Sequence, residues 1–80
     1  MDAQILERVR GIAADVLQVR QGSLSAESSP QSVESWDSVQ HLNLVLALEA
    51  RYGIQFEPEE MDRMKNLGMI VELLESKMRF

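Results

Sequence analysis

The sequence predicts an all-α protein of four helices, three long and one short, with a long loop between the first two. Three segments carry apolar residues at spacings of three and four, the period of one helix face. Residues that favour helix starts or ends stand at the edges of these segments. Between the first two segments, residues 18–35 hold Gly22, Pro30 and a series of serines, a composition that disfavours a helix.

The first helix is predicted over residues 2–17, with Asp2 as its N-cap. Its apolar face comprises Ile5, Val9, Ile12, Ala13 and Val16. We expect Leu24 and Val33 to pin the following loop to the core, and residues 28–30 could begin a short turn of helix. A loop of this length in a compact domain is often functional.

The second helix is predicted over residues 38–52, with Asp37 as its N-cap and Gly53 as its C-cap. Gln40 completes a capping-box pattern with Asp37, and we expect Trp36 to pack over the start of the helix. Apolar residues surround so much of this helix that it should be the most buried one. They are Val39, Leu42, Leu44, Val45, Leu46, Ala47 and Leu48.

The remaining chain predicts a short helix and a last long one. Pro58 opens the short helix, at about residues 59–65, and places acids in its first turn where the helix dipole favours them. Asn66 is the expected cap of the last helix, residues 67–77. Its buried stripe comprises Leu67, Ile70, Val71, Leu73 and Leu74.

Composition narrows the class of protein. The 80 residues suit one domain, residues 1–80. The absence of cysteine excludes a disulfide framework and a thiolate metal site. A net charge of −5 disfavours nucleic acid as a partner, and the longest apolar run, residues 44–48, is too short to enter a bilayer as a span. Without a signal-peptide pattern, we expect a soluble, cytoplasmic protein.

Ser38 is the leading candidate for a functional residue. Asp-Ser is an ordinary pair at a helix start, because both side chains can accept from backbone N–H groups there. If Asp37 is the cap, however, the Ser38 hydroxyl faces solvent at the positive end of the helix dipole. A phosphodiester at that place would be stabilised by the dipole and by free N–H groups. The pattern therefore suggests a serine that another enzyme modifies.

His41 lies one helical turn from Ser38, so a Ser-His nucleophile pair and a small hydrolase are conceivable. Such a site also needs an orienting group, an oxyanion hole and a pocket that excludes water, and only Asp37 and Gln40 are near. We favour an imidazole at the edge of the solvent or facing a partner. A lone histidine without cysteine is also a poor metal site, so no metal is expected.

Two further groups have plain interpretations. The acids of the third helix do not have the spacing of a calcium loop, and we favour helix-start electrostatics over a docking surface. These acids are Glu57, Glu59, Glu60 and Asp62. Most of the methionines are expected to fill the core, with a ligand-adaptable core as the alternative. These are Met61, Met64, Met69 and Met78.

Taken in order, these features resemble the acyl carrier protein family. The resemblance rests on the first amphipathic helix, the Ser/Pro loop, and the junction Trp36-Asp37-Ser38-Val39 followed by Leu42. It continues through residues 44–49, 52–56 and 58–61, the last two being similar to the family's link and short third helix. It covers nearly the whole chain and implies a four-helix bundle of the acyl-carrier type.

The resemblance implies that a phosphopantetheinyl transferase attaches phosphopantetheine from coenzyme A to Ser38, with Asp37 as helix cap and recognition residue. The thiol of the arm would then hold an acyl or aminoacyl group as a thioester. Acyl-loading and acyl-using enzymes would be the partners, and the carrier would have no catalytic residue. The resemblance also implies a monomer, as is usual for acidic carriers of this size. The alternative is a helical interaction module, derived from a carrier, that never bears the arm.

Family position also implies two sets of contact residues. The surface for partner enzymes would comprise Val39, Gln40, Asn43, Glu49, Met61 and Asp62. The walls of an acyl pocket between the helices would comprise Leu48, Phe56, Met61, Met64 and Ile70. Met61 is bulkier than the alanine often found at its place, so such a pocket would be small, and plain core packing is the alternative.

The second helix departs from the pattern of fatty-acid carriers, which are usually richer in acids there. This chain has Gln40, Asn43, Ala50 and Arg51 where acids are common. The junction of residues 36–38 with His41 and Leu42 is more similar to specialised carriers. We therefore expect a role in secondary-metabolite, aminoacyl or surface-polysaccharide synthesis.

Overall fold

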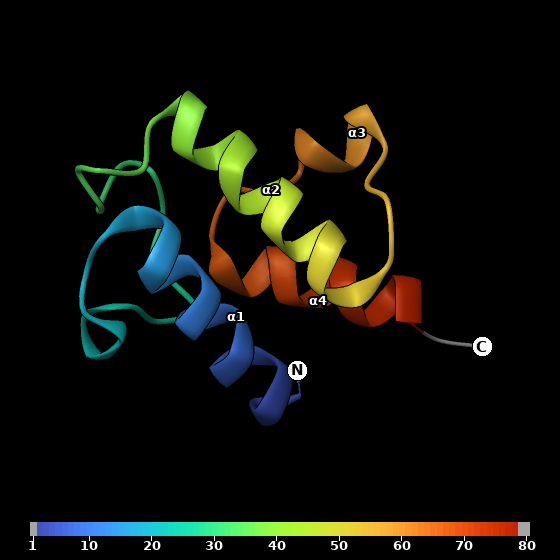
Figure 1. Cartoon of the computed structure of the whole chain (residues 1–80), viewed down its shortest axis with the longest axis horizontal. Coiled ribbons are helices and arrows are strands. Elements are labelled where there is room, and N and C mark those ends of the chain that lie inside the picture. The colour runs from blue at the N-terminus through green and yellow to red at the C-terminus, as the bar shows by residue number, and fades with distance from the viewer. Residues whose placement is uncertain (1, 79–80) are drawn as a thin grey trace.

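The computed structural model describes residues 2–78, and this part of the chain is all-α, as predicted. It contains α1 (Ala3–Leu17), the 3-10 turn η1 (Gln21–Ser23), α2 (Ser38–Tyr52), α3 (Pro58–Met61) and α4 (Leu67–Met78). α1 packs against both α2 and α4, and the short α3 lies beyond them at the side of the molecule (Figure 1). Three long helices and one short one thus form the fold.

One cluster of buried side chains joins the three long helices. α1 contributes Val9, Ala13, Ala14 and Leu17; α2 contributes Leu44, Val45 and Leu48; α4 contributes Leu67, Ile70, Val71, Leu73 and Leu74. The connecting segments add Leu24, Trp36, Phe56 and Met64. Met64 is thus the one buried core methionine of those predicted, while Met61, Met69 and Met78 are only partly buried.

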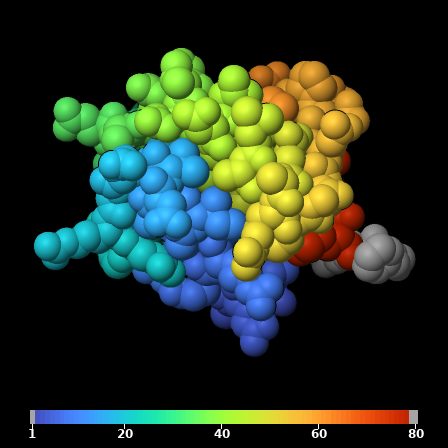
Figure 2. Space-filling view, viewed as in Figure 1, coloured from blue at the N-terminus to red at the C-terminus, as the bar shows by residue number. Residues whose placement is uncertain are grey.

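α2 is not the most buried helix, contrary to the prediction. Val39, Leu42 and Leu46 are 66%, 52% and 52% exposed. The reason is tertiary: α2 runs across one face of the molecule, and no other helix of residues 2–78 covers its outward side (Figure 2). α4 contributes more buried residues than α2 does. The wide apolar surface of α2 is therefore two stripes, of which only one enters the core.

The predicted caps are confirmed. Asp2 Oδ1 accepts from the N–H groups of Gln4 and Ile5 at 2.8 and 3.2 Å. Asn66 Oδ1 accepts from Met69 N at 2.9 Å. Gly53 closes α2 with a φ of 64°, in the left-handed region that glycine adopts without steric cost.

Two local predictions are wrong. Gln40 does not complete a capping box with Asp37, because its Oε1 accepts from Asn43 Nδ2 at 3.1 Å. α3 ends at Met61 and not near residue 65. The chain then makes tight turns, with Arg63 N and Met64 N bonding three residues back, which carry the Met64 side chain into the core.

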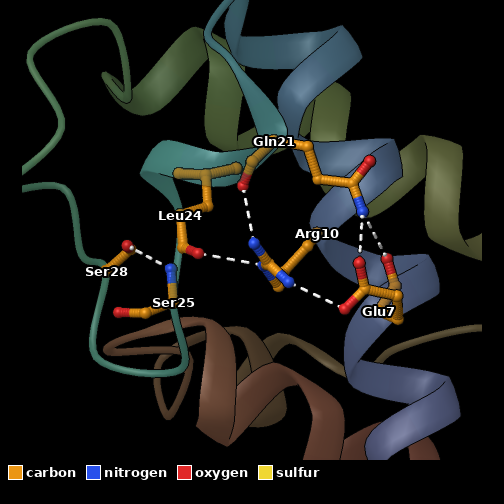
Figure 3. Close-up of polar contacts among 6 residues, drawn as sticks. All are labelled: Glu7, Arg10, Gln21, Leu24, Ser25 and Ser28. Carbon is orange, nitrogen blue, oxygen red and sulfur yellow. Dashed lines mark hydrogen bonds and ion pairs between the residues drawn. The ribbon is translucent and has the colours of Figure 1, made fainter.

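Arg10 of α1 ties down the start of the long loop (Figure 3). Its Nε donates to Leu24 O at 2.9 Å and its Nη2 donates to Gln21 O at 2.9 Å. The third nitrogen, Nη1, pairs with Glu7 Oε2 at 2.7 Å. Leu24 is buried and Val33 is partly buried against the core, so both pin the loop as expected.

The loop also docks on the start of α4. Leu67 N donates to Ser28 O at 3.0 Å and Gly68 N donates to Ala26 O at 2.8 Å. The first N–H groups of a helix have no partner within it, so the loop satisfies two that would otherwise be buried and unpaired. Ser28 is itself buried, and its Oγ accepts from Ser25 N at 2.9 Å.

Residues 28–30 begin a single hydrogen-bonded turn, as predicted, which does not continue into a helix. Ser32 N and Val33 N both donate to Ser29 O, at 3.0 and 2.9 Å. The turn points the chain towards Trp36 and the start of α2. A loop fixed at α1, at α4 and at this turn is a rigid approach to Ser38.

Candidate functional site at the start of α2

Ser38 is the first residue of α2, and it is exposed. Asp37 makes the cap: its Oδ1 accepts from Gln40 N at 2.8 Å, and its carbonyl accepts from His41 N at 2.8 Å. The Ser38 hydroxyl therefore has no part in capping. It stands at the helix end that carries partial positive charge.

Trp36 packs directly against the start of α2. Its ring is 2% exposed, and its Nε1 donates to His41 Nδ1 at 3.1 Å. The indole and imidazole rings stack with centroids 6.1 Å apart and planes 23° from parallel. The predicted packing of Trp36 over the first turn of α2 is confirmed.

The same hydrogen bond fixes the tautomer of His41. An indole N–H is a donor only, so Nδ1 of the imidazole must be the acceptor and carries no proton. Partial burial lowers the pKa of His41 from its usual value near 6.5. At neutral pH the ring is therefore uncharged, with its proton on Nε2.

This arrangement does not provide a hydrolase. A protonated Nε2 cannot accept the Ser38 proton, and Nδ1 is already bonded to Trp36. The Asp37 carboxylate bonds to Gln40 N, where it holds the helix and does not orient the imidazole. Ser38 thus lacks the base that a nucleophilic serine requires.

The surface is hollowed beside Ser38. An open depression of about 400 Å³, here named the Trp36 hollow, is lined by Pro30, Trp36, Asp37, Ser38, His41 and Met64. A second depression of about 310 Å³, the Lys65 hollow, is lined by Pro30, Gln31, Met61, Asp62, Met64 and Lys65. The two hollows share Pro30 and Met64, so they adjoin.

The five residues proposed as walls of an acyl pocket occupy different places. Leu48, Phe56 and Ile70 are buried in the core cluster. Met64 lines both hollows and Met61 lines the Lys65 hollow. The sequence analysis did not predict that Pro30, Trp36 and His41 would line a depression at Ser38. The feature of the sequence that could have indicated it is the presence of two aromatic rings, Trp36 and His41, within three residues of the serine.

The residues proposed for partner contact lie mostly on the surface. Val39, Asn43 and Asp62 are exposed, whereas Gln40 and Met61 are partly buried. Glu49 has an internal role, because its Oε2 accepts from Phe56 N at 2.8 Å. Residues 38–48 contain no Asp, Glu, Lys or Arg. The outward face of α2 next to Ser38 is therefore uncharged and rich in apolar groups.

Glu59 and Glu60 lie in the first turn of α3, as the sequence indicated, whereas Asp62 follows its end. Glu60 Oε1 accepts from Glu57 N at 2.7 Å and pairs with Lys77 Nζ at 2.8 Å. The Glu57 N–H, and after it Lys77, hold the pKa of Glu60 below its usual value. Within residues 2–78 no group of three or more His, Asp or Glu is arranged to hold a metal ion.

Comparisons with known proteins agree with this geometry. The family model described as "Phosphopantetheine attachment site" matches residues 7–74. The acyl carrier protein of Thermosynechococcus vestitus is 29% identical over 94% of this chain and 93% of its own length. The acyl carrier protein of Petrotoga mobilis is 28% identical over 94% of this chain and 88% of its own.

A solved structure shows the same fold. The solution structure of holo acyl carrier protein from Geobacter metallireducens has a TM-score of 0.82 and 32% identity, covering 90% of this chain and 83% of that one. Fold and family match thus define a helical carrier with a phosphopantetheine prosthetic group. The chain belongs to the acyl carrier protein family, whose members interact with acyl-handling enzymes and are not enzymes themselves.

The start of α2 suits the prosthetic group. It offers an exposed hydroxyl, a helix N-terminus that favours a phosphodiester, and an adjoining hollow. No helix in the described part of the chain is long and apolar enough to cross a membrane.

Proposed function

We propose that Ser38 is the residue to which phosphopantetheine is attached, and that the chain carries acyl or aminoacyl groups on it. The observation that supports this is the division between Asp37 and Ser38. Asp37 caps α2, so the exposed Ser38 hydroxyl is available to another enzyme without loss of the helix end. The arm, when bound, supplies a terminal thiol that holds the acyl group as a thioester.

In the loading reaction, Ser38 Oγ attacks the phosphorus of coenzyme A that bears pantetheine. A new Oγ–P bond forms, the P–O bond to the adenosine bisphosphate breaks, and the hydroxyl proton passes to a base. Within residues 2–78 no base is placed for this, since His41 is bonded to Trp36 and protonated at Nε2. A phosphopantetheinyl transferase would supply the base and the metal. We propose that this loading takes place in the cytoplasm.

Mass spectrometry tests the attachment site. The purified chain is incubated with coenzyme A, Mg²⁺ and a broad-specificity transferase, and its intact mass should rise by one phosphopantetheinyl group. Trypsin cannot locate the group, because no Lys or Arg lies between Arg20 and Arg51. Cleavage after glutamate releases residues 35–49, in which Ser35 and Ser38 are the only serines.

Two variants separate these serines. Ser38→Ala should abolish the mass gain, and Ser35→Ala should leave it unchanged because the Ser35 Oγ is buried and without a hydrogen-bond partner. A gain in Ser38→Ala would show that the assignment is wrong. No gain in the wild type, beside an active control carrier, would instead favour the interaction module that bears no arm.

We further propose that the partners belong to a specialised pathway and not to fatty-acid synthesis. The support is the uncharged outward face of α2, where Val39, Leu42 and Leu46 are exposed. Charge pairs steer partners and exclude wrong ones. An enzyme that recognises acidic residues on this helix would have none to bind between Ser38 and Leu48.

Restoring acids tests this proposal. The holo chain and its Gln40→Glu/Asn43→Glu variant are offered to a malonyl transferase of fatty-acid synthesis, and thioester formation is followed by mass. We expect slow loading of the wild type and at least tenfold faster loading of the variant. Fast loading of the wild type would contradict the specialised role.

A further inference from the structure

The Trp36 hollow begins at the residue that would bear the arm. Ser38 is one of its lining residues, together with Asp37 on the same turn. A group attached to Ser38 Oγ therefore starts at the rim of the hollow, and its next atoms can only project outward or fold into it. The structure thus supplies both a depression and a tether that keeps its occupant near.

The chemistry of the walls suits the first part of the arm. Pro30 is an exposed apolar wall, whereas Trp36 and Met64, which are 2% and 4% exposed, reach the hollow only with the edges of their side chains. Most of the exposed lining is apolar. His41 adds one polar group, the Nε2–H that remains when Nδ1 is bonded to Trp36. In phosphopantetheine, a phosphate and a methylene are followed by a carbon with two methyl groups, then by a hydroxyl and an amide carbonyl. The apolar walls suit the two methyl groups, and the single N–H donor suits the amide carbonyl.

We propose that the Trp36 hollow binds the pantoyl part of the arm carried by Ser38, packing its methyl groups against Pro30, Trp36 and Met64 and offering His41 Nε2–H to its amide. This proposal rests on the attachment of phosphopantetheine to Ser38. It makes His41 a positioning residue for the arm and gives the Trp36–His41 pair a role beyond the support of the helix.

A weak interaction is sufficient for such a site. A short flexible tether gives its end an effective concentration in the mM range, so an intrinsic dissociation constant of about 1 mM would half fill the hollow. Removing methyl groups from water is favourable in itself. The arm would therefore exchange between a folded-back and an extended form, which leaves its thiol able to reach partner enzymes.

The core offers no comparable place. Leu44, Val45 and Leu48 of α2 have zero exposure, as do Leu67, Ile70 and Leu74 of α4. Entry there would separate side chains packed at the density of a protein interior. The hollow, in contrast, is already open.

Nuclear magnetic resonance of apo and holo protein tests the proposal. Trp36 is the only tryptophan, so the single indole N–H signal reports on it without assignment by mutation. In protein shown by mass to be fully holo, we expect the indole N–H and the Met64 methyl signals to shift, and nuclear Overhauser effects to join the pantoyl methyl groups to both. Tyr52, at the other end of α2, should not shift.

The two prolines provide matched variants. Pro30 lines the hollow and Pro58 opens α3, and both are exposed, so replacing either with alanine should preserve the fold. Pro30→Ala should weaken the Overhauser effects at least twofold and Pro58→Ala should not. Unchanged Trp36 and Met64 signals in verified holo protein, or equal effects of the two variants, would overturn the proposal. A failure to gain mass would instead count against attachment at Ser38.

Discussion

At the scale of single residues, the site depends on two neighbours with separate tasks. Asp37 holds the first turn of α2 through Gln40 N, and Ser38 contributes nothing to that cap. A serine that also capped the helix would have to give up a hydrogen bond on modification. Separating the tasks lets the hydroxyl change chemically while the helix stays in place.

This separation predicts unequal effects on stability. Asp37→Ala should lower the free energy of unfolding by about 1 kcal/mol, the usual cost of losing an N-cap. Ser38→Ala should change it by less than half as much. Urea unfolding followed by circular dichroism measures both, and equal losses would show that Ser38 shares the capping.

His41 predicts a pH dependence of stability. Burial lowers its pKa in the folded state below 6.5, so the unfolded chain binds the proton more tightly. The stability that the neutral imidazole contributes is fully present above pH 6.5. It is lost as the pH falls through the lower pKa of the folded state. Protonation also turns Nδ1 into a donor facing the Trp36 N–H.

Urea midpoints at pH 7.5 and 5.5 check this effect. The wild type should lose more stability over this interval than His41→Gln, which has no group that titrates there. Carboxylates such as Glu60 change charge at lower pH and are common to both proteins. An equal loss in the two proteins would rule out His41 as the cause.

At the scale of elements, α2 shows that apolar residues of one helix can have different tasks. Leu44 has zero exposure in the core, whereas Leu42 is 52% exposed on the outward face beside Ser38. Leu44→Ala should therefore cost about 3 kcal/mol of unfolding free energy, and Leu42→Ala less than 1 kcal/mol. Chemical denaturation compares them, and similar costs would mean that the outward stripe is packed in solution.

The short α3 shows how tertiary contacts limit a helix. Phe56 before it and Met64 after it are both buried, so the chain must turn twice within a short distance. Glu60 holds the helix to Glu57 N and to Lys77 of α4, and Lys77 Nζ lies 5.8 Å from the centre of the Phe56 ring. These contacts fix α3 beside the Lys65 hollow.

At the scale of the whole molecule, the long loop joins parts that are distant in sequence. Arg10 connects it to α1, and the carbonyls of Ala26 and Ser28 connect it to the start of α4. The loop ends at Trp36 beneath Ser38. The position of the site therefore depends on contacts made far from it.

Removing Arg10 should loosen this connection. Arg10→Ala leaves the partly buried Leu24 carbonyl without its donor and removes one of the two donors to Gln21 O, the other being Leu24 N. It should cost about 1–3 kcal/mol of unfolding free energy. Arg8→Ala, an exposed position on the same helix, is the matched control and should cost less than 0.5 kcal/mol. Hydrogen exchange in residues 24–36 should quicken only in Arg10→Ala, and similar exchange in both would contradict the role of Arg10.

Local signals in the sequence located most of the fold and the principal site residues. The caps at Asp2, Asp37 and Asn66, the glycine after α2 and the exposure of Ser38 all depend on residues close in sequence. The links that depend on distant partners were not foreseen. The contacts of Arg10 with the loop, the Trp36–His41 bond and the hollow beside it were not predicted.

What the sequence alone determined is therefore the helices, their starts and the available serine, because capping and periodicity are interactions within a few residues. Tertiary structure decided which apolar stripe of α2 enters the core and where α3 ends. It also decided that the loop, Trp36, His41 and Met64 together form a hollow at Ser38. Those outcomes depend on which surfaces meet when the helices pack, and no single segment carries that information.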